Sequence, residues 1–212
     1  NGWTEKNNVY HEKYDFQRIE DDTNILISKC LRSELDGSVI FNIYSINLVE
    51  RLNLRFPKGI YEDIPFAYHA MVAAKKRHKS NFISYIKHNT DGSIVNTISK
   101  KHINDLLNSC VTVKRNFENM GVIKDSNLES DFIYGAHGYL AILIRKILLN
   151  NQFSKENKID LLSYLIKIKN AHPELSDLPL RKETKKDQLS SYFLENYGNN
   201  EINLMELINR VS

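Results

Sequence analysis

Apolar residues recur at helical spacing over most of the chain. After Asp63 they fall at i, i+3, i+4, i+7 and i+8, which gives one apolar side of a helix: Ile64, Ala67, Tyr68, Met71 and Val72. Asp63 stands where an N-cap is expected. Pro65 is tolerated in a first turn because the first helical amides have no partner inside the helix. The pattern therefore predicts a helix that begins at Asp63.

Further helices are predicted on both sides of this one. A stripe from Ile103 to Phe117 predicts a helix that starts after Ser99 and closes at Gly121. Turn-forming residues delimit the other expected helices, which are Thr23 to Leu35, Ser45 to Leu52, 126–150, 154–171, 185–197 and 201–211.

Strand signals are few. Phe82 to His88 alternates and is rich in aromatic and β-branched residues, so we expect a strand there. Residues 1–22 are polar with scattered aromatics, which indicates a loop or an irregular hairpin.

Composition narrows the classes of function. With 212 residues, of which 42% are apolar, the chain can bury one sizeable core, or a medium domain plus a helical appendage. The net charge of +3 and 26% charged residues fit neither a disordered chain nor a general polyanion binder. Basic runs at 75–79 and 181–186 lie at helix ends or in loops, so no nucleic-acid partner is expected.

The two cysteines indicate a reducing compartment. Cys30 and Cys110 lie 80 positions apart and match no spacing of metal ligands, and a disulfide framework would need more of them. A cytoplasmic location fits best. The basic runs also suit an anionic lipid surface, so peripheral association with the inner face of the membrane is a further expectation.

The most apolar stretch runs from Phe132 to Leu149 and contains His137, Arg145 and Lys146. Charges of this kind are costly inside a bilayer, which favours a buried helix over a helix at a membrane surface. Gly135 and Gly138 flank His137 in this helix. Two glycines there could mark a site, but close packing on a neighbouring helix, with His137 partnered in the core, is favoured.

Two adjacent carboxylates, Glu62 and Asp63, carry the clearest candidate chemistry. At a helix N-terminus the free amides and the helix dipole stabilise negative charge, so an acid there is held ionised near neutral pH. Such a carboxylate could act as general base for a sugar hydroxyl, or Asp63 could simply cap the helix. The residues alone leave both interpretations open.

The segment around these carboxylates resembles family 2 glycosyltransferases. The resemblance rests on Leu54-Arg-Phe-Pro-Lys-Gly-Ile-Tyr-Glu-Asp-Ile-Pro-Phe66, Ala74-Lys-Lys76, Ile83 to His88 and Gly92-Ser-Ile94, in the family's order, within about residues 38–97. It implies an α/β fold, with residues 1–98 as the C-terminal, acceptor-side portion of a GT-A glycosyltransferase domain and residues 99–212 as a mainly α-helical extension.

The resemblance also implies an activity. The expected reaction transfers a sugar from a nucleotide-sugar donor to a hydroxyl of a glycan acceptor with inversion, as in bacterial capsule or other cell-surface polysaccharide synthesis. Asp63 would be the catalytic base, and Glu62 would help to hold the acceptor or the loop. A non-catalytic helical docking module on a degenerate transferase half is the alternative.

Donor binding is expected to involve the end of the predicted strand. By resemblance, Lys87 would neutralise the donor diphosphate, and His88 would lie near the diphosphate or ligate a metal. In the alternative interpretation, both are solvated residues before a turn. The expected cofactor is a divalent metal, Mn²⁺ or Mg²⁺, held mainly by an Asp-x-Asp motif that does not occur in these 212 residues. The segment Phe41-Asn-Ile-Tyr44 keeps the family's Asn and Tyr but lacks its Lys, so a substrate contact from it is not expected.

Overall fold

The computed structural model describes residues 2–6, 9–14, 22–78, 85–88, 97–122 and 126–196. For 2–6, 9–14, 86–88 and 126–127 the description is confined to the backbone. Within these ranges the elements are mostly helices: α1 (Thr23–Leu31), a 3₁₀ turn η1 (Val39–Phe41), α2 (Ile46–Arg51), α3 (Asp63–Ala73), α4 (Lys100–Asn119), α5 (Ser126–Leu148), α6 (Lys155–Ala171), α7 (Pro173–Ser176) and α8 (Lys185–Asn196).

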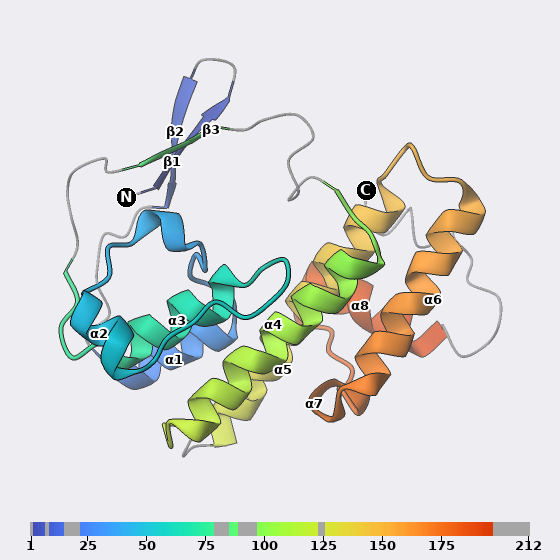
Figure 1. The fold of residues 1–212 in the computed structure, drawn as a ribbon. Coiled ribbons are helices and arrows are strands. Elements are labelled where there is room, and N and C mark those ends of the chain that lie inside the picture. The colour runs from blue at the N-terminus through green and yellow to red at the C-terminus, as the bar shows by residue number, and fades with distance from the viewer. Residues whose placement is uncertain are drawn as a thin grey trace.

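Two long helices, α4 and α5, form the centre of the molecule. Figure 1 shows them running side by side, with α1, α2 and α3 on one side and α6, α7 and α8 on the other. Helix α3 packs on α4, and α1 packs on α5, so the segment that carries Asp63 rests against the central pair.

A small sheet lies beyond α1 to α3 in Figure 1. It consists of β1 (Gly2–Lys6), β2 (Val9–Tyr14) and β3 (Ile86–His88), in the order β2-β1-β3. Strand β1 is antiparallel to β2 and parallel to β3. The expected irregular hairpin near the N-terminus is therefore present, with a register shift between Gly2 and Trp3.

The expectation of an α/β fold for this chain is wrong. A GT-A domain is built on a large, mainly parallel sheet whose faces are covered by helices. The described part of the chain instead packs helix on helix, and its strands are short and lie apart from the core. Val39–Phe41 forms a 3₁₀ turn, and the described strand at the end of the 82–88 segment comprises only Ile86–His88.

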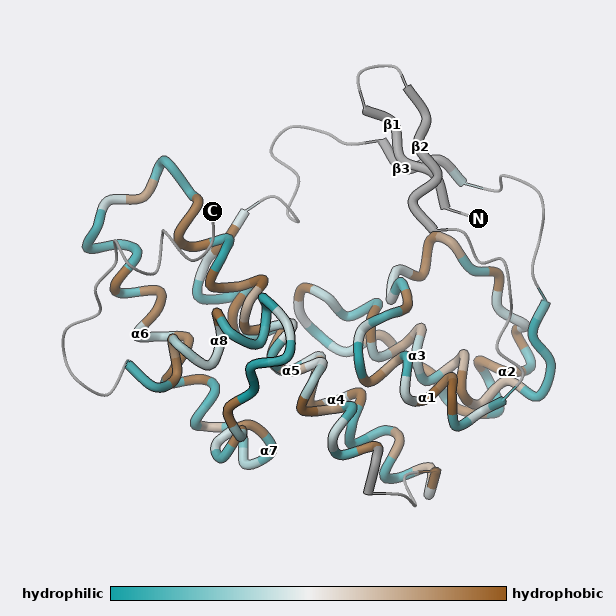
Figure 2. Tube along the Cα trace, turned by 180° about the vertical axis from the view of Figure 1, so that it is seen from behind, coloured by the Kyte–Doolittle hydropathy of each residue, from teal (hydrophilic) through white to brown (hydrophobic). Residues whose placement is uncertain are grey.

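The reason is that the helices bury their apolar stripes against one another. Ile103, Leu107 and Phe117 of α4 are fully buried, and they belong to one cluster with residues of α1, α3, α5, α6 and α8. Figure 2 shows hydrophobic positions recurring between hydrophilic ones along α4 and α5, as amphipathic helices require. This core includes residues from before and after position 98.

Most helix boundaries agree with the sequence pattern, with differences at the caps. Asp22, not Thr23, caps α1, because its carboxylate accepts hydrogen bonds from the amides of Asn24 and Ile25. Helix α1 ends at Leu31, earlier than expected. The helix predicted from Ser99 onward is α4, and Ser99 is its N-cap. The helix expected at 201–211 lies outside the described residues.

Helix α5 is a buried helix of the core, as predicted. A Cβ on Gly135 would lie 1.9 Å from the carbonyl oxygen of Leu31, so α1 and α5 cross there at backbone distance. His137 is fully buried, with Nε2 2.8 Å from the carbonyl of Pro179 and Nδ1 2.6 Å from Ser190 Oγ. The prediction of close packing is confirmed for Gly135 but not for Gly138, whose Cβ would have nothing within 4 Å, and the prediction of a partnered histidine is confirmed. Among the described helices, none is both long enough and apolar enough to cross a membrane.

Candidate functional site

The loop from Leu54 to Glu62 leads into α3, and two of its residues have left-handed backbone conformations. Gly59 has φ +135° and Tyr61 has φ +67°. A non-glycine residue at positive φ is disfavoured, so contacts from elsewhere must stabilise the conformation of Tyr61.

Helix α4 supplies these contacts. Asp105 Oδ2 accepts a hydrogen bond from the amide of Ile60 at 2.8 Å, and Ser109 Oγ donates to the carbonyl of Tyr61 at 2.9 Å. The two side chains are four residues apart and therefore lie on one face of α4. Together they fix one peptide unit on each side of Tyr61, just ahead of Asp63.

Asp105 is held as a carboxylate. Burial raises its pKa, but hydrogen bonds from Lys101, the Ile60 amide and Asn104 outweigh the burial, so its pKa lies below the ordinary value. A Cβ on Gly59 would come within 2.9 Å of Asp105 Oδ2. Glycine is thus required at position 59 both by its φ and by the approach of this carboxylate.

A second loop braces the start of α3 from another side. Tyr68 Oη donates to the carbonyl of Leu35 at 2.6 Å, and a Cβ on Gly37 would lie 2.9 Å from Ile64 Cγ1. Asp36, between these contacts, is buried and accepts a hydrogen bond from the amide of Ser38. The first turn of α3 is therefore fixed from two directions.

Asp63 is the first helical residue of α3, and Glu62 occupies the N-cap position without a capping hydrogen bond from its side chain. The prediction that Asp63 is itself the N-cap is therefore off by one residue. The carboxylate is half-buried at the surface of the helix N-terminus.

The pKa of Asp63 is raised above its ordinary value. Burial is the largest cause and the charge of Glu62 the next, while the amides of Asp63 and Ile64 lower the pKa and the charge of Asp36 raises it. The stabilisation of the charged form by the helix N-terminus is thus outweighed by burial and by neighbouring carboxylates. A raised pKa makes Asp63 a better proton acceptor than an exposed aspartate.

Three aromatic rings adjoin the carboxylate. Phe66, one turn further along α3, stacks on Phe56 with ring centroids 4.2 Å apart and planes 13° from parallel. Tyr44 packs edge-on against Phe66 at 5.4 Å. Phe56 is 52% exposed, so one face of this stack opens to solvent.

For the other two predicted site residues, Lys87 and His88, the structure describes only the backbone. The backbones of Lys87 and His88 form the last two positions of β3, opposite Thr4 and Glu5 of β1, and their side chains lie outside the described residues. Among the residues whose side chains are described, no group of three or more His, Cys, Asp or Glu comes together as a metal site. The expected roles of Lys87 and His88 stay predictions.

Comparison with known proteins leaves the family open. No protein-family model, curated protein or solved structure matches the chain. The resemblance of Leu54 to Phe66 to family 2 glycosyltransferases therefore stays a prediction.

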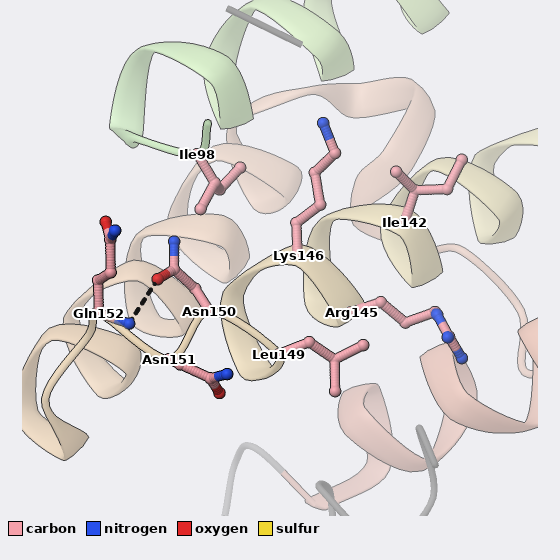
Figure 3. A pocket seen from close by; sticks show the side chains of 8 residues that line it. All are labelled: Ile98, Ile142, Arg145, Lys146, Leu149, Asn150, Asn151 and Gln152. Atoms are coloured by element: carbon pink, nitrogen blue, oxygen red, sulfur yellow. Dashed lines mark hydrogen bonds between the residues drawn. The ribbon is translucent and has the colours of Figure 1, made fainter. Parts of the chain in front are cut away.

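A pocket of about 630 Å³ lies away from these residues, at the end of α5. It is lined by Ile98, Ile142, Arg145, Lys146, Leu149, Asn150, Asn151 and Gln152. Figure 3 shows the Arg145 and Lys146 side chains diverging rather than meeting over a common point. A specific site needs a few convergent polar groups, which favours the loop and helix around Asp63 as the candidate site.

Sequence reasoning missed the contribution of α4. Residues 99–212 were expected to be an extension outside the transferase portion, yet Asp105 and Ser109 hold the loop that carries the candidate site. Their signal was present as two polar residues, four apart, alongside the apolar stripe of α4. The loop that they bind is 45 to 48 residues away in sequence, and the pattern of one helix does not reveal such a partner.

Proposed function

We propose that the chain contributes the acceptor side of a nucleotide-sugar-dependent glycosyltransferase, with Asp63 as the general base. The observation that carries the proposal is a half-buried carboxylate with a raised pKa, at a helix N-terminus that two loops and α4 brace. The resemblance of the Leu54 to Phe66 segment supports the reaction class.

The proposed step is an inverting displacement. An acceptor hydroxyl gives its proton to the Asp63 carboxylate while its oxygen forms a bond to the anomeric carbon of the donor sugar. The bond from that carbon to the diphosphate breaks, and the nucleoside diphosphate leaves with the electron pair. In-line attack requires the base and the leaving group on opposite faces of the donor sugar.

The surroundings of Asp63 suit the role of a base. Its pKa is raised above the ordinary value by burial and by Glu62, which makes it a stronger base toward a sugar hydroxyl. The bracing by Asp105, Ser109 and Tyr68 holds the helix N-terminus in one position, which general-base catalysis needs. Glu62 tunes the pKa of Asp63 and lies beside the acceptor.

A divalent metal is part of the expectation from the resemblance, and it would offset the charge of the leaving diphosphate. The described side chains do not form a ligand set for it. No step above is routed through a metal for that reason, and the proposal concerns proton transfer at Asp63.

The test is a transfer screen on the complete gene product. Nucleotide sugars are supplied one at a time with Mn²⁺ or Mg²⁺ and a panel of glycan acceptors, and products are detected by mass spectrometry. Transfer to a glycan by the wild type, and its absence with Asp63→Asn, would support the proposal. A wild type that leaves every donor intact would contradict it.

A docking role is the second candidate, because large apolar side chains are exposed around the start of α2. Ile43 is 94% exposed and Ile46 is 64% exposed, next to the start of α2. If this surface serves only to dock a partner, Ile43→Ser with Ile46→Ser would abolish partner capture, while the screen above would find no transfer by the wild type.

A further inference from the structure

An exposed aromatic ring stands close to the candidate base. Phe56 is 52% exposed and lies flat on Phe66, with the ring planes 13° apart. Phe66 follows Asp63 by three residues, which places the two side chains about one turn apart on neighbouring positions of α3. Phe56 therefore offers an exposed apolar ring that packs on the residue one turn after Asp63.

The ring of Phe56 is held in place by Phe66, which in turn packs against Tyr44. Phe66 is buried, and Tyr44 packs against it edge-on at 5.4 Å with the planes 85° apart. The three rings thus form a continuous stack from Tyr44 through Phe66 to Phe56. A ring already fixed in this way loses little conformational freedom when a ligand packs on it.

Tyr44 links the stack to Asp63. Burial raises the pKa of Tyr44 to about 12, an effect that Asn42 opposes and the charge of Asp63 adds to. Its hydroxyl is buried, and among the described residues no hydrogen bond of acceptable geometry reaches it.

Sugar rings match such a surface chemically. A pyranose in its chair form presents a face of C–H groups whose hydrogens carry partial positive charge, and an aromatic face carries partial negative charge. Stacking therefore buries the apolar face of the sugar and leaves its hydroxyl groups at the edges free for other contacts. A sugar on Phe56 would have such an edge available for the carboxylate of Asp63, which lies one helical turn before Phe66.

We propose that Phe56 is the platform on which the terminal pyranose ring of the acceptor glycan stacks, so that one of its hydroxyl groups faces Asp63. The inference rests on the proposed function, and it adds the class of ligand and the residue that positions it. Phe56 is a positioning residue here, since it binds the acceptor without exchanging a proton with it.

Two measurements on the complete gene product test the platform. The first is the KM for the acceptor and the KM for the donor in wild type, Phe56→Ala, Phe56→Trp and the control Ile43→Ala. The second is binding of methyl pyranosides, by saturation-transfer NMR, to the Asp63→Asn protein with and without Phe56→Ala. Ile43 serves as the control because it is apolar and 94% exposed and is not itself one of the three stacked rings.

The expected result is specific to the acceptor. Phe56→Ala should raise the acceptor KM about tenfold, the factor that loss of a stacking contact of ordinary strength gives. The donor KM and kcat should stay within about twofold. Phe56→Trp should restore the acceptor KM, Ile43→Ala should leave it unchanged, and the methyl pyranoside signal should vanish with Phe56→Ala.

Other outcomes would overturn the platform. The platform would be contradicted if Phe56→Ala left the acceptor KM unchanged, or if Ile43→Ala had an equal effect on it. It would also be contradicted if a lowered melting temperature of Phe56→Ala accounted for the change in KM, or if the Asp63→Asn protein gave no pyranoside signal. These are distinct from failure of the proposed function. If the wild type transfers no sugar, yet pyranosides bind in a manner that depends on Phe56, the platform holds and the transferase assignment falls.

Discussion

At the scale of the residue, the surroundings of Asp63 shift the pKa of its carboxyl group in opposite directions. Burial and the charge of Glu62 raise its pKa, and the amides of Asp63 and Ile64 lower it, with the balance toward a raised value. Because the two leading causes are separable by mutation, the role of Glu62 can be tested apart from that of Asp63.

Replacing Glu62 by Gln should shift the pH profile of the enzyme. The variant removes the neighbouring charge, so the pKa of Asp63 falls and the acid limb of kcat/KM moves to lower pH. The check is kcat/KM measured from pH 4.5 to 8 in both proteins. The control is Glu50→Gln on α2, a residue that is not among the charges acting on Asp63. An acid limb that stays in place in Glu62→Gln would show that another group is the base.

The two carboxylates could be identified from the sequence, but the balance of effects that sets the pKa of Asp63 could not. The stabilising effect of a helix N-terminus is local and can be reasoned from Asp63 and the residues after it. Burial under neighbouring elements, and the approach of Asp36 from the other loop, depend on tertiary packing. The direction of the shift was for that reason beyond the reach of pattern analysis.

At the scale of the element, α4 is expected to control the loop that carries the site. Asp105→Ala removes the acceptor of the Ile60 amide, and loss of a buried hydrogen bond of this kind costs about 1–3 kcal/mol of unfolding free energy. The activity should fall by more than the loss of stability explains, because Asp63 is no longer held in place. The checks are urea unfolding and kcat/KM.

Two variants sharpen the test of α4. Asp105→Asn keeps an acceptor for the Ile60 amide, so it should recover part of the activity that Asp105→Ala loses. Asp160→Ala removes an exposed carboxylate that pairs with Lys100, and should change little. Equal activity in Asp105→Ala and wild type would contradict the bracing role.

The crossing of α1 and α5 gives a second prediction at this scale. Gly135→Ala places a methyl group against the carbonyl of Leu31, at 1.9 Å without relaxation, and overpacking of this kind destabilises by about 1–3 kcal/mol or more. Gly138→Ala is the matched control, since nothing lies within 4 Å of its Cβ, and it should stabilise α5 by about 0.5–1 kcal/mol. Thermal unfolding of both variants checks this. Similar effects of the two would contradict the close crossing.

At the scale of the whole molecule, the core was more predictable than the fold class. The stripes of α3 and α4 follow from local spacing. The α4 stripe is buried throughout, while in α3 Ala67, Tyr68 and Val72 are buried and Ile64 and Met71 are partly buried. The fold class came from a resemblance limited to about residues 38–97, which does not determine how the helices of the remainder pack. The pairing of Trp3 with Ile86 illustrates the difficulty, since no local pattern specifies contacts over such separations.

The buried histidine predicts how the stability of the molecule depends on pH. Burial lowers the pKa of His137, which hydrogen bonding to Pro179 opposes in part. The unfolded chain therefore binds the proton more readily, so the contribution of His137 is complete above its unfolded pKa of 6.5 and is lost as the pH falls below it. The urea midpoint should decrease between pH 7.5 and pH 5.5.

The variant His137→Gln isolates this contribution, because His69 and His172 also have pKa values lowered by burial. The variant should be less stable than wild type at pH 7.5, with a smaller decrease in its urea midpoint toward pH 5.5. If the two proteins lose stability in parallel over this range, His137 does not titrate as its burial requires.

The most direct test of the account compares the transfer rate of Asp63→Asn with that of wild type at saturating donor and acceptor, alongside their melting temperatures. Loss of a general base should lower the rate about 10²- to 10⁴-fold. The melting temperature should not fall, because the raised pKa means that the charge of Asp63 is unfavourable in the folded state and Asn removes it. A rate within about twofold of wild type, or a loss of rate matched by a lower melting temperature, would contradict the assignment of Asp63 as the base.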